Sequence, residues 1–141
     1  RIGMLATNPT FLQWIMQVKS NVDSGQFRPM QLAAVEALKA DKTWYAGMNA
    51  VYKRRRLLAE AILKALGCTW DPAQSGLFLW GRVPENGLDG AALSDKVLYE
   101  ANVFITPGFI FGSQGERYVR LSLCCTEENL TKALERVSAL H

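Results

Sequence analysis

The most strand-like stretch of the chain is residues 118–123, where apolar and other side chains alternate. A β-strand sends successive side chains to opposite faces, so Val119, Leu121 and Leu123 share one apolar face. Arg120 lies on the other face. The polar outer face of a half-exposed sheet would account for this arginine, and the pattern by itself favours that interpretation.

A helix is predicted near the start of the chain. Asn8 suits the N-cap position and Pro9 the first helical position. The apolar residues that follow on one helical face are Phe11, Ile15 and Val18. The polar residues 20–26 interrupt the pattern, so we expect the helix to end there.

Two further helices are predicted over residues 29–40 and 43–66. The longer one has a single apolar stripe, formed by Trp44, Met48, Val51, Leu58 and Ile62. Gly67 can adopt the left-handed conformation that ends many helices. A helix of this length in a chain of 141 residues suggests a connection between domains.

Beyond Gly67 the pattern changes to short strands, predicted over residues 68–72, 76–83 and 103–106, with residues 74–76 as a turn. Asp89 is expected to cap a helix over residues 90–100, and Asn102 suits a left-handed cap after it. Thr126 is expected to cap the last helix, which has Glu127 and Glu128 in its first turn. The fold class predicted is α/β, as a two-layer α+β piece with a mixed or antiparallel sheet.

Composition and charge exclude some classes of function. The chain is 49% apolar and 21% charged, which is typical of a globular protein, and its net charge of +3 is too small and scattered to indicate nucleic acid binding. The basic run at residues 53–56 lies within the predicted long helix and is interpreted as a solvated face. No apolar run approaches the ~20 residues of a membrane span and no signal peptide is visible, so we expect a cytoplasmic protein.

The three cysteines do not indicate a metal site. Cys68, Cys124 and Cys125 lack the spacing of a zinc site, and His141 is the only histidine. We expect the cysteines to be reduced packing residues.

Residues 103–123 read VFITPGFIFGSQGERYVRLSL, with a Pro-Gly corner, two further glycines and a strand that carries an arginine. This order closely resembles the C-terminal signature of the class I and II aminotransferases, which are fold-type I pyridoxal-phosphate enzymes. The matching residues are Pro107, Gly108, Phe111, Gly112, Gly115, Tyr118, Val119 and Arg120. The resemblance implies that Arg120 binds the α-carboxylate of the amino-acid substrate, because a planar guanidinium grips a carboxylate at two points.

The opening residues, RIGMLA, resemble the segment that follows the Schiff-base lysine in the same family. The resemblance implies that Arg1 binds the phosphate of pyridoxal 5'-phosphate and that the lysine lies before Arg1. Residues 24–38 resemble the family's loop and helix that reach the neighbouring subunit, which implies a homodimer. Residues 74–83 resemble its glycine-aromatic strand.

The domain organisation implied by the resemblance is a tail of the large cofactor-binding domain over residues 1–43, then the interdomain helix and C-terminal small domain over residues 44–141. Because the first residue is an arginine and the Schiff-base lysine is missing, we expect a C-terminal piece of a longer enzyme that holds no catalytic residue and is inactive alone. The rest of the large domain would be its partner.

The implied reaction transfers an amino group between an amino acid and a 2-oxo acid. Fold-type I lyases and synthases share the carboxylate-binding and phosphate-binding arginines, and a non-catalytic regulatory module with this fold is a further alternative. Arg28 could be a second cation for an acidic substrate, but a surface arginine beside Pro29 is at least as good an interpretation. Phe109 and Ile110 weakly favour an apolar substrate.

Overall fold

The computed structural model describes residues 2–140 and divides into two units between Tyr45 and Ala46. The first unit contains α1 (Pro9–Val22) and α2 (Arg28–Leu38). The Phe11 amide donates to Asn8 Oδ1 at 3.0 Å, so the predicted N-cap is confirmed. Neither helix buries a residue within this structure.

Helix α3 (Lys42–Ala65) begins at a cap that the sequence analysis missed. The Trp44 amide donates to Asp41 Oδ1 at 2.8 Å. Only its C-terminal half is buried, through Ala59, Ile62 and Leu63. Trp44, which was predicted to belong to the apolar stripe, is 55% exposed.

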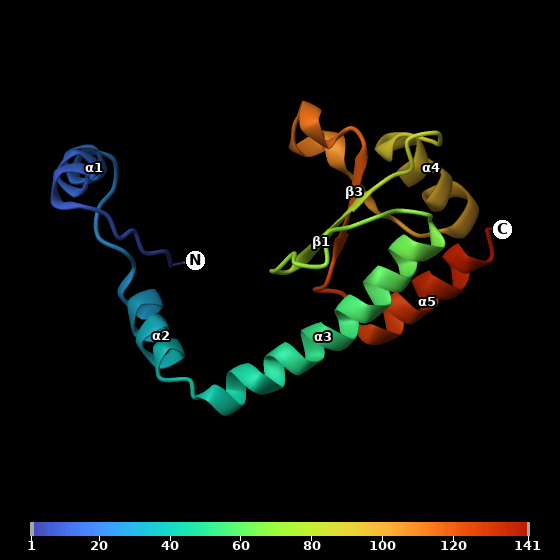
Figure 1. The fold of residues 1–141 in the computed structure, drawn as a ribbon. Helices are drawn as coiled ribbons and strands as arrows, with labels where there is room; N and C mark the ends of the chain where they lie inside the picture. Colours follow the sequence, from blue (N-terminus) through green and yellow to red (C-terminus); the bar gives the residue numbers. More distant parts are fainter. Residues whose placement is uncertain (1, 141) are drawn as a thin grey trace. The chain divides into compact units, whose positions relative to one another are not determined.

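The second unit holds a three-stranded antiparallel sheet of β1 (Phe78–Arg82), β2 (Thr106–Pro107) and β3 (Tyr118–Ser122). Its order is β1-β3-β2, so β3 is central (Figure 1). Arg120 is therefore opposite Trp80 on one side and Thr106 on the other.

Two predicted strands differ from the structure. The strand predicted over residues 68–72 is wrong, because only Thr69 forms a bridge, to Arg82. The Ala73 amide donates to Asp71 Oδ1 at 2.8 Å, and this turn bends the chain away from the sheet. Of the strand predicted over residues 103–106, only Thr106 lies in a strand, β2. The Ser94 hydroxyl donates to the Ile105 carbonyl at 2.5 Å, so this carbonyl bonds to a side chain and not to a neighbouring strand.

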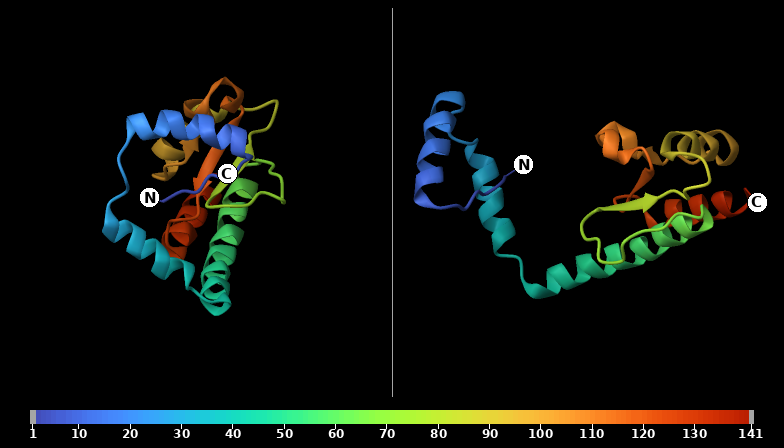
Figure 2. Two further views of the ribbon diagram at one scale, coloured as in Figure 1. Left: turned by 90° about the vertical axis from the view of Figure 1, so that its left-hand side faces the viewer. Right: turned by 45° about the horizontal axis from the view of Figure 1, so that its top comes forward.

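Two helices complete this unit, α4 (Gly90–Ala101) and α5 (Glu127–Ser138). Their predicted N-caps, Asp89 and Thr126, accept backbone hydrogen bonds at 2.8 and 3.2 Å. Asn102 adopts the predicted left-handed conformation with φ of 53°. The C-terminal half of α3 and α5 lie side by side on one face of the sheet (Figures 1 and 2). The core combines these helices with α4 and the inner side of the sheet, through residues that include Ile62, Leu63, Leu79, Val97, Val119, Leu121 and Val137.

The basic run at residues 53–56 is not simply a solvated face, so that interpretation is wrong for two of its members. Arg55 and Arg56 are partly buried. Arg55 Nη1 donates to the Leu123 carbonyl at 3.1 Å. Arg56 Nη2 donates to the Pro72 carbonyl at 2.9 Å. These arginines fasten the loops at the ends of the strands to α3.

Candidate functional site

Arg120 lies at the centre of the middle strand, on the face of the sheet opposite the core. Its neighbours Val119 and Leu121 are 0% and 6% exposed and belong to the core. The alternation predicted from the sequence is therefore confirmed. The side chains that share Arg120's face, here called the aromatic face, are Phe78, Trp80 and Arg82 from β1, Tyr118 and Ser122 from β3, and Phe111 from the loop before β3.

The guanidinium of Arg120 makes cation–π contacts with two phenylalanine rings. Its central carbon is 4.1 Å from the ring centroid of Phe78 and 4.0 Å from that of Phe111. Both distances are well within the range of a cation–π contact. The two rings therefore hold the guanidinium, and its N–H groups can still donate to a ligand.

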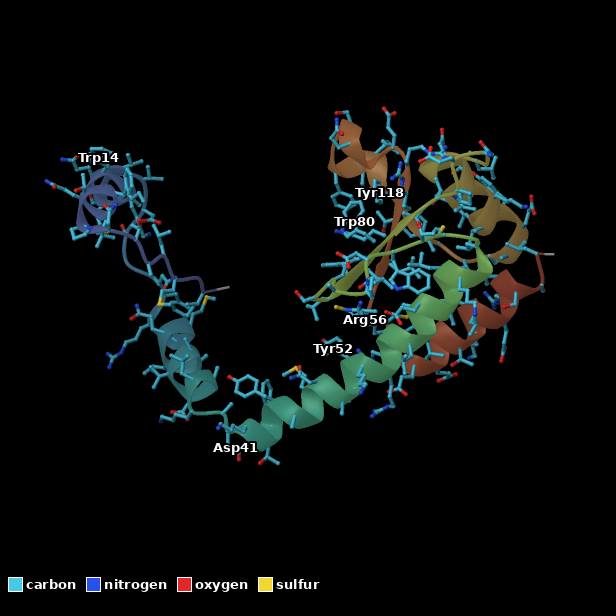
Figure 3. The ribbon with its side chains drawn as sticks, viewed as in Figure 1. Trp14, Asp41, Tyr52, Arg56, Trp80 and Tyr118 are labelled. Carbon is cyan, nitrogen blue, oxygen red and sulfur yellow. The ribbon has the colours of Figure 1, made fainter. Side chains whose placement is uncertain are left out.

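Two further aromatic residues extend this contact. Trp80 lies edge-on to Phe111 at 5.4 Å between ring centroids and to Tyr118 at 6.1 Å. Trp80 and Tyr118 project from the same side of the sheet in Figure 3, the side opposite α3. A pocket of about 360 Å³ opens between Trp80, Phe111 and Tyr118. Arg120 thus lies among aromatic side chains, of which Phe78 and Phe111 are 41% and 48% exposed.

The glycine-rich loop puts Phe111 in place. Between β2 and β3 the chain forms two short 3₁₀ helices, η1 (Gly108–Phe111) and η2 (Ser113–Gly115). Gly108 and Gly115 meet so closely that a Cβ on Gly115 would lie 2.1 Å from the Gly108 carbonyl oxygen. This contact folds the loop back and holds Phe111 against Arg120.

Arg120 has no acidic partner among residues 2–140. Arg82, on the same face, is paired with Glu85. The buried side-chain nitrogens that lack a partner in this part of the chain belong to Arg55 and Arg117, so the nitrogens of Arg120 are not among them. Arg120 also borders a pocket of about 570 Å³, together with Thr106 and Ser122. The arrangement offers an unneutralised guanidinium that an anion can reach.

The structure says less about the other candidate site residues. Arg1 lies outside the described residues, so its predicted contact with the cofactor phosphate remains a prediction. Arg28 is the first residue of α2 and is exposed. No group of residues suited to hold a metal ion is found over residues 2–140, and no helix there is long and apolar enough to cross a membrane. Burial raises the pKa of the Cys68 thiol to about 11, which suits a packing residue.

The sequence analysis missed the residues that hold Arg120. Phe78 and Trp80 stand two positions apart in the predicted strand 76–83, so the period of two could have put them on one face. The contact of Phe111 has no such local signal, because it depends on how the glycine loop folds back.

Comparisons with known proteins identify the family of this chain. The sequence model of the family "Aminotransferase class I and II" matches residues 1–137. The chain belongs to this family.

Among curated relatives, the LL-diaminopimelate aminotransferase of Oleidesulfovibrio alaskensis is 36% identical over 140 residues, which are 99% of this chain and 36% of that protein. The enzyme of the same name from Halothermothrix orenii is 34% identical over 137 residues, 97% of this chain and 35% of that protein. The chain therefore spans about a third of the length of the curated relatives that it matches.

Solved structures give the same family. The BacF structure from Bacillus subtilis superposes with a TM-score of 0.76 at 30% identity, over 94% of this chain and 34% of that one. The aromatic aminotransferase from Pyrococcus horikoshii gives a TM-score of 0.67 at 35% identity, over 78% of this chain and 30% of that one. The predicted α/β fold of a fold-type I aminotransferase is thereby confirmed.

Proposed function

We propose that this chain forms the C-terminal part of a pyridoxal-phosphate-dependent aminotransferase and that Arg120 binds the α-carboxylate of its substrates. Residues 44–141 would be the interdomain helix and small domain, and residues 1–43 the tail of the large domain. The enzyme would act in the cytoplasm as a homodimer on an amino acid and a 2-oxo acid.

The observation that supports this proposal is the set of side chains around Arg120. Its guanidinium has no carboxylate partner among the described residues, while its central carbon lies over the rings of Phe78 and Phe111. A substrate carboxylate can accept two parallel hydrogen bonds from the N–H edge, which fixes the orientation of the carboxylate as well as its position. Lysine would supply the charge without that orientation.

The residues that would hold the cofactor lie partly in this chain and partly outside it. None of the side chains on the aromatic face is a lysine, so the described residues of this face suit the substrate and not covalent attachment of the cofactor. Pyridoxal phosphate, when bound, supplies the electron sink that stabilises negative charge at the substrate's Cα. The contribution of Arg120 would be to hold the substrate so that its Cα–H bond is correctly oriented toward that group.

The aromatic residues would assist this binding. Phe78 and Phe111 contact the guanidinium at 4.1 and 4.0 Å and would hold it in position for a carboxylate. The names of the relatives favour amino-group transfer over the lyase and synthase alternatives. The same names support a polar amino acid as substrate more than the apolar one suggested by Phe109 and Ile110.

The test uses the full-length enzyme and steady-state kinetics with amino-acid and 2-oxo-acid pairs. Arg120→Lys should lower kcat/KM by a factor equivalent to about 1.5–3 kcal/mol, as expected when a charged two-point contact is lost. The absorbance of the bound cofactor should remain unchanged. Arg82→Lys is the matched control on the same face, because Arg82 is already paired with Glu85. An unchanged kcat/KM in Arg120→Lys would reject the proposal.

A further inference from the structure

The backbone of Trp80 forms its outward hydrogen bonds with a side chain. The Trp80 amide donates to Gln74 Oε1 at 2.8 Å, and Gln74 Nε2 donates to the Trp80 carbonyl at 2.9 Å. The primary amide of glutamine has the same donor and acceptor as a peptide group. Gln74 therefore pairs with Trp80 as a neighbouring strand would.

This pairing extends an incomplete ladder along the free edge of the sheet. β1 is an edge strand, and the backbone N–H and C=O groups of Arg82, Trp80 and Phe78 point away from β3. Arg82 exchanges two backbone hydrogen bonds with Thr69, at 2.7 and 2.9 Å. The chain then leaves the sheet, and the side chain of Gln74 supplies the next rung.

The geometry links this rung to the Arg120 site. Both backbone groups of Trp80 point to Gln74, so the opposed residues Trp80 and Arg120 form a non-hydrogen-bonded pair across β1 and β3. Side chains of such pairs approach each other more closely than those of hydrogen-bonded pairs. β1 also carries Phe78, which contacts Arg120, and Trp80 contacts Phe111, the second ring over the guanidinium.

An ion pair on α3 holds the Gln74 loop. Arg56 Nε contacts Glu60 Oε1 at 2.8 Å, and the two side chains are only 24% and 23% exposed. The remaining nitrogens of Arg56 donate to the carbonyls of Pro72 and Gln74. Figure 3 shows Arg56 directed from α3 toward β1. A guanidinium suits this task because its planar fork can bind one carboxylate and two carbonyls together.

We propose that Gln74, anchored by Arg56 and Glu60, is a positioning residue of the Arg120 site: its side chain replaces a missing strand and fixes β1 so that Phe78 contacts the guanidinium and Trp80 supports Phe111. This inference rests on the proposed role of Arg120 for its functional meaning, whereas the positioning itself can be measured without any substrate.

The first test uses the unmodified 141-residue chain and amide hydrogen exchange by NMR. The Trp80 amide should be protected although it faces the edge of the sheet. The Phe78 amide, which faces the same way without such a partner, is the internal reference. Equal exchange rates at Trp80 and Phe78 would overturn the proposal without requiring any variant to fold.

The second test compares variants by the Nε–H resonance of Arg120, which the rings of Phe78 and Phe111 should displace from the usual arginine position. In Gln74→Met this resonance should move toward that position, and the Trp80 amide should exchange roughly two- to tenfold faster, as expected for the loss of an intramolecular hydrogen bond. Arg56→Lys should also move the Arg120 resonance toward the usual position and speed the exchange of the Trp80 amide.

Two controls separate positioning from general stability. Gln31→Met also removes an amide hydrogen bond to a carbonyl, that of Gln26 at 2.7 Å, but on α2. Val137→Ala opens the core on α5, where Val137 is 0% exposed. Neither should move the Arg120 resonance, although Val137→Ala should lower the melting temperature. The proposal fails if Gln74→Met leaves the Arg120 resonance unchanged in folded protein. If the resonance moves but Arg120 does not respond to carboxylates, the proposed function fails and the positioning stands.

Discussion

The central carbon of the Arg120 guanidinium lies over the rings of Phe78 and Phe111, 4.1 and 4.0 Å from their centroids. The two rings come from segments more than thirty residues apart, β1 and the loop before β3. Only the tertiary fold brings them to the arginine. Because no carboxylate of the described residues joins them, the site holds a cation in place without neutralising it.

Phe111→Ala should weaken carboxylate binding by removing one of the two rings. A cation–π contact at an exposed site contributes about 0.5–1 kcal/mol, so we expect a loss of affinity of that size. Titration with a carboxylate, followed by NMR, measures it. Phe109→Ala is the matched control, because Phe109 is similarly exposed in the same 3₁₀ helix and has no ring contact with Arg120. Equal affinities of the two variants would show that the stacking is unimportant.

Gly115→Ala should destabilise the glycine loop, because the new Cβ would lie 2.1 Å from the Gly108 carbonyl oxygen, an atom of the backbone that cannot rotate away. Overpacking of this kind costs about 1–3 kcal/mol. Chemical denaturation measures the change in the free energy of unfolding. Gly47→Ala serves as control, since nothing lies within 4 Å of its Cβ position and alanine favours the helix. A stability of Gly115→Ala equal to that of the original chain would contradict the described backbone contact.

Much of this fold follows from local patterns, and the parts that do not are contacts between distant segments. Asn8, Asp89 and Thr126 were correctly predicted as N-caps, because a cap depends on residues three positions away. The face of Arg120 followed from the period of a strand. Gln74, in contrast, was predicted only as a turn residue.

The pairing of Gln74 with Trp80, and of Arg56 with the loop around Pro72, leaves no mark on hydrophobic periodicity. For the same reason Arg55 and Arg56 of the basic run were wrongly predicted to lie on a solvated face. Periodicity reports which side of an element is buried, but it does not report which polar group a distant loop presents to that element.

The pKa of Cys68 predicts a decrease in stability at alkaline pH. Burial raises this pKa from 9.0 to about 11, so between these values the thiol ionises in the unfolded chain and remains neutral in the folded one. The unfolded state then binds fewer protons, and the free energy of unfolding falls as the pH rises from about 9 to 11.

Thermal unfolding of the original chain and of Cys68→Ala across this pH range tests the prediction. The variant should be less stable at neutral pH because it leaves a cavity, but its stability should fall less steeply above pH 9. Parallel curves for the two proteins would contradict it.

The 141-residue chain should self-associate through α1. This helix buries none of its residues here, and Phe11, Trp14 and Val18 are 48%, 56% and 66% exposed. Apolar patches of this kind are uncommon on the surfaces of soluble monomers. Light scattering after size-exclusion chromatography should give a mass above that of one chain, and Val18→Glu should lower it. A monomer at every concentration would refute this prediction.

The central claim is that Arg120 binds a carboxylate, and the most direct measurement is NMR of the arginine Nε–H resonances in this chain during titration with a 2-oxo acid. The amide of the same acid, at equal ionic strength, is the control for charge. We predict a saturable shift at Arg120 that the amide does not cause, with smaller shifts at the paired residues Arg54 and Arg82. In Arg120→Lys, the ring resonances of Phe78 and Phe111 should lose their response to the acid. A shift at Arg120 no larger than that at Arg82, or the same response to acid and amide, would contradict the account.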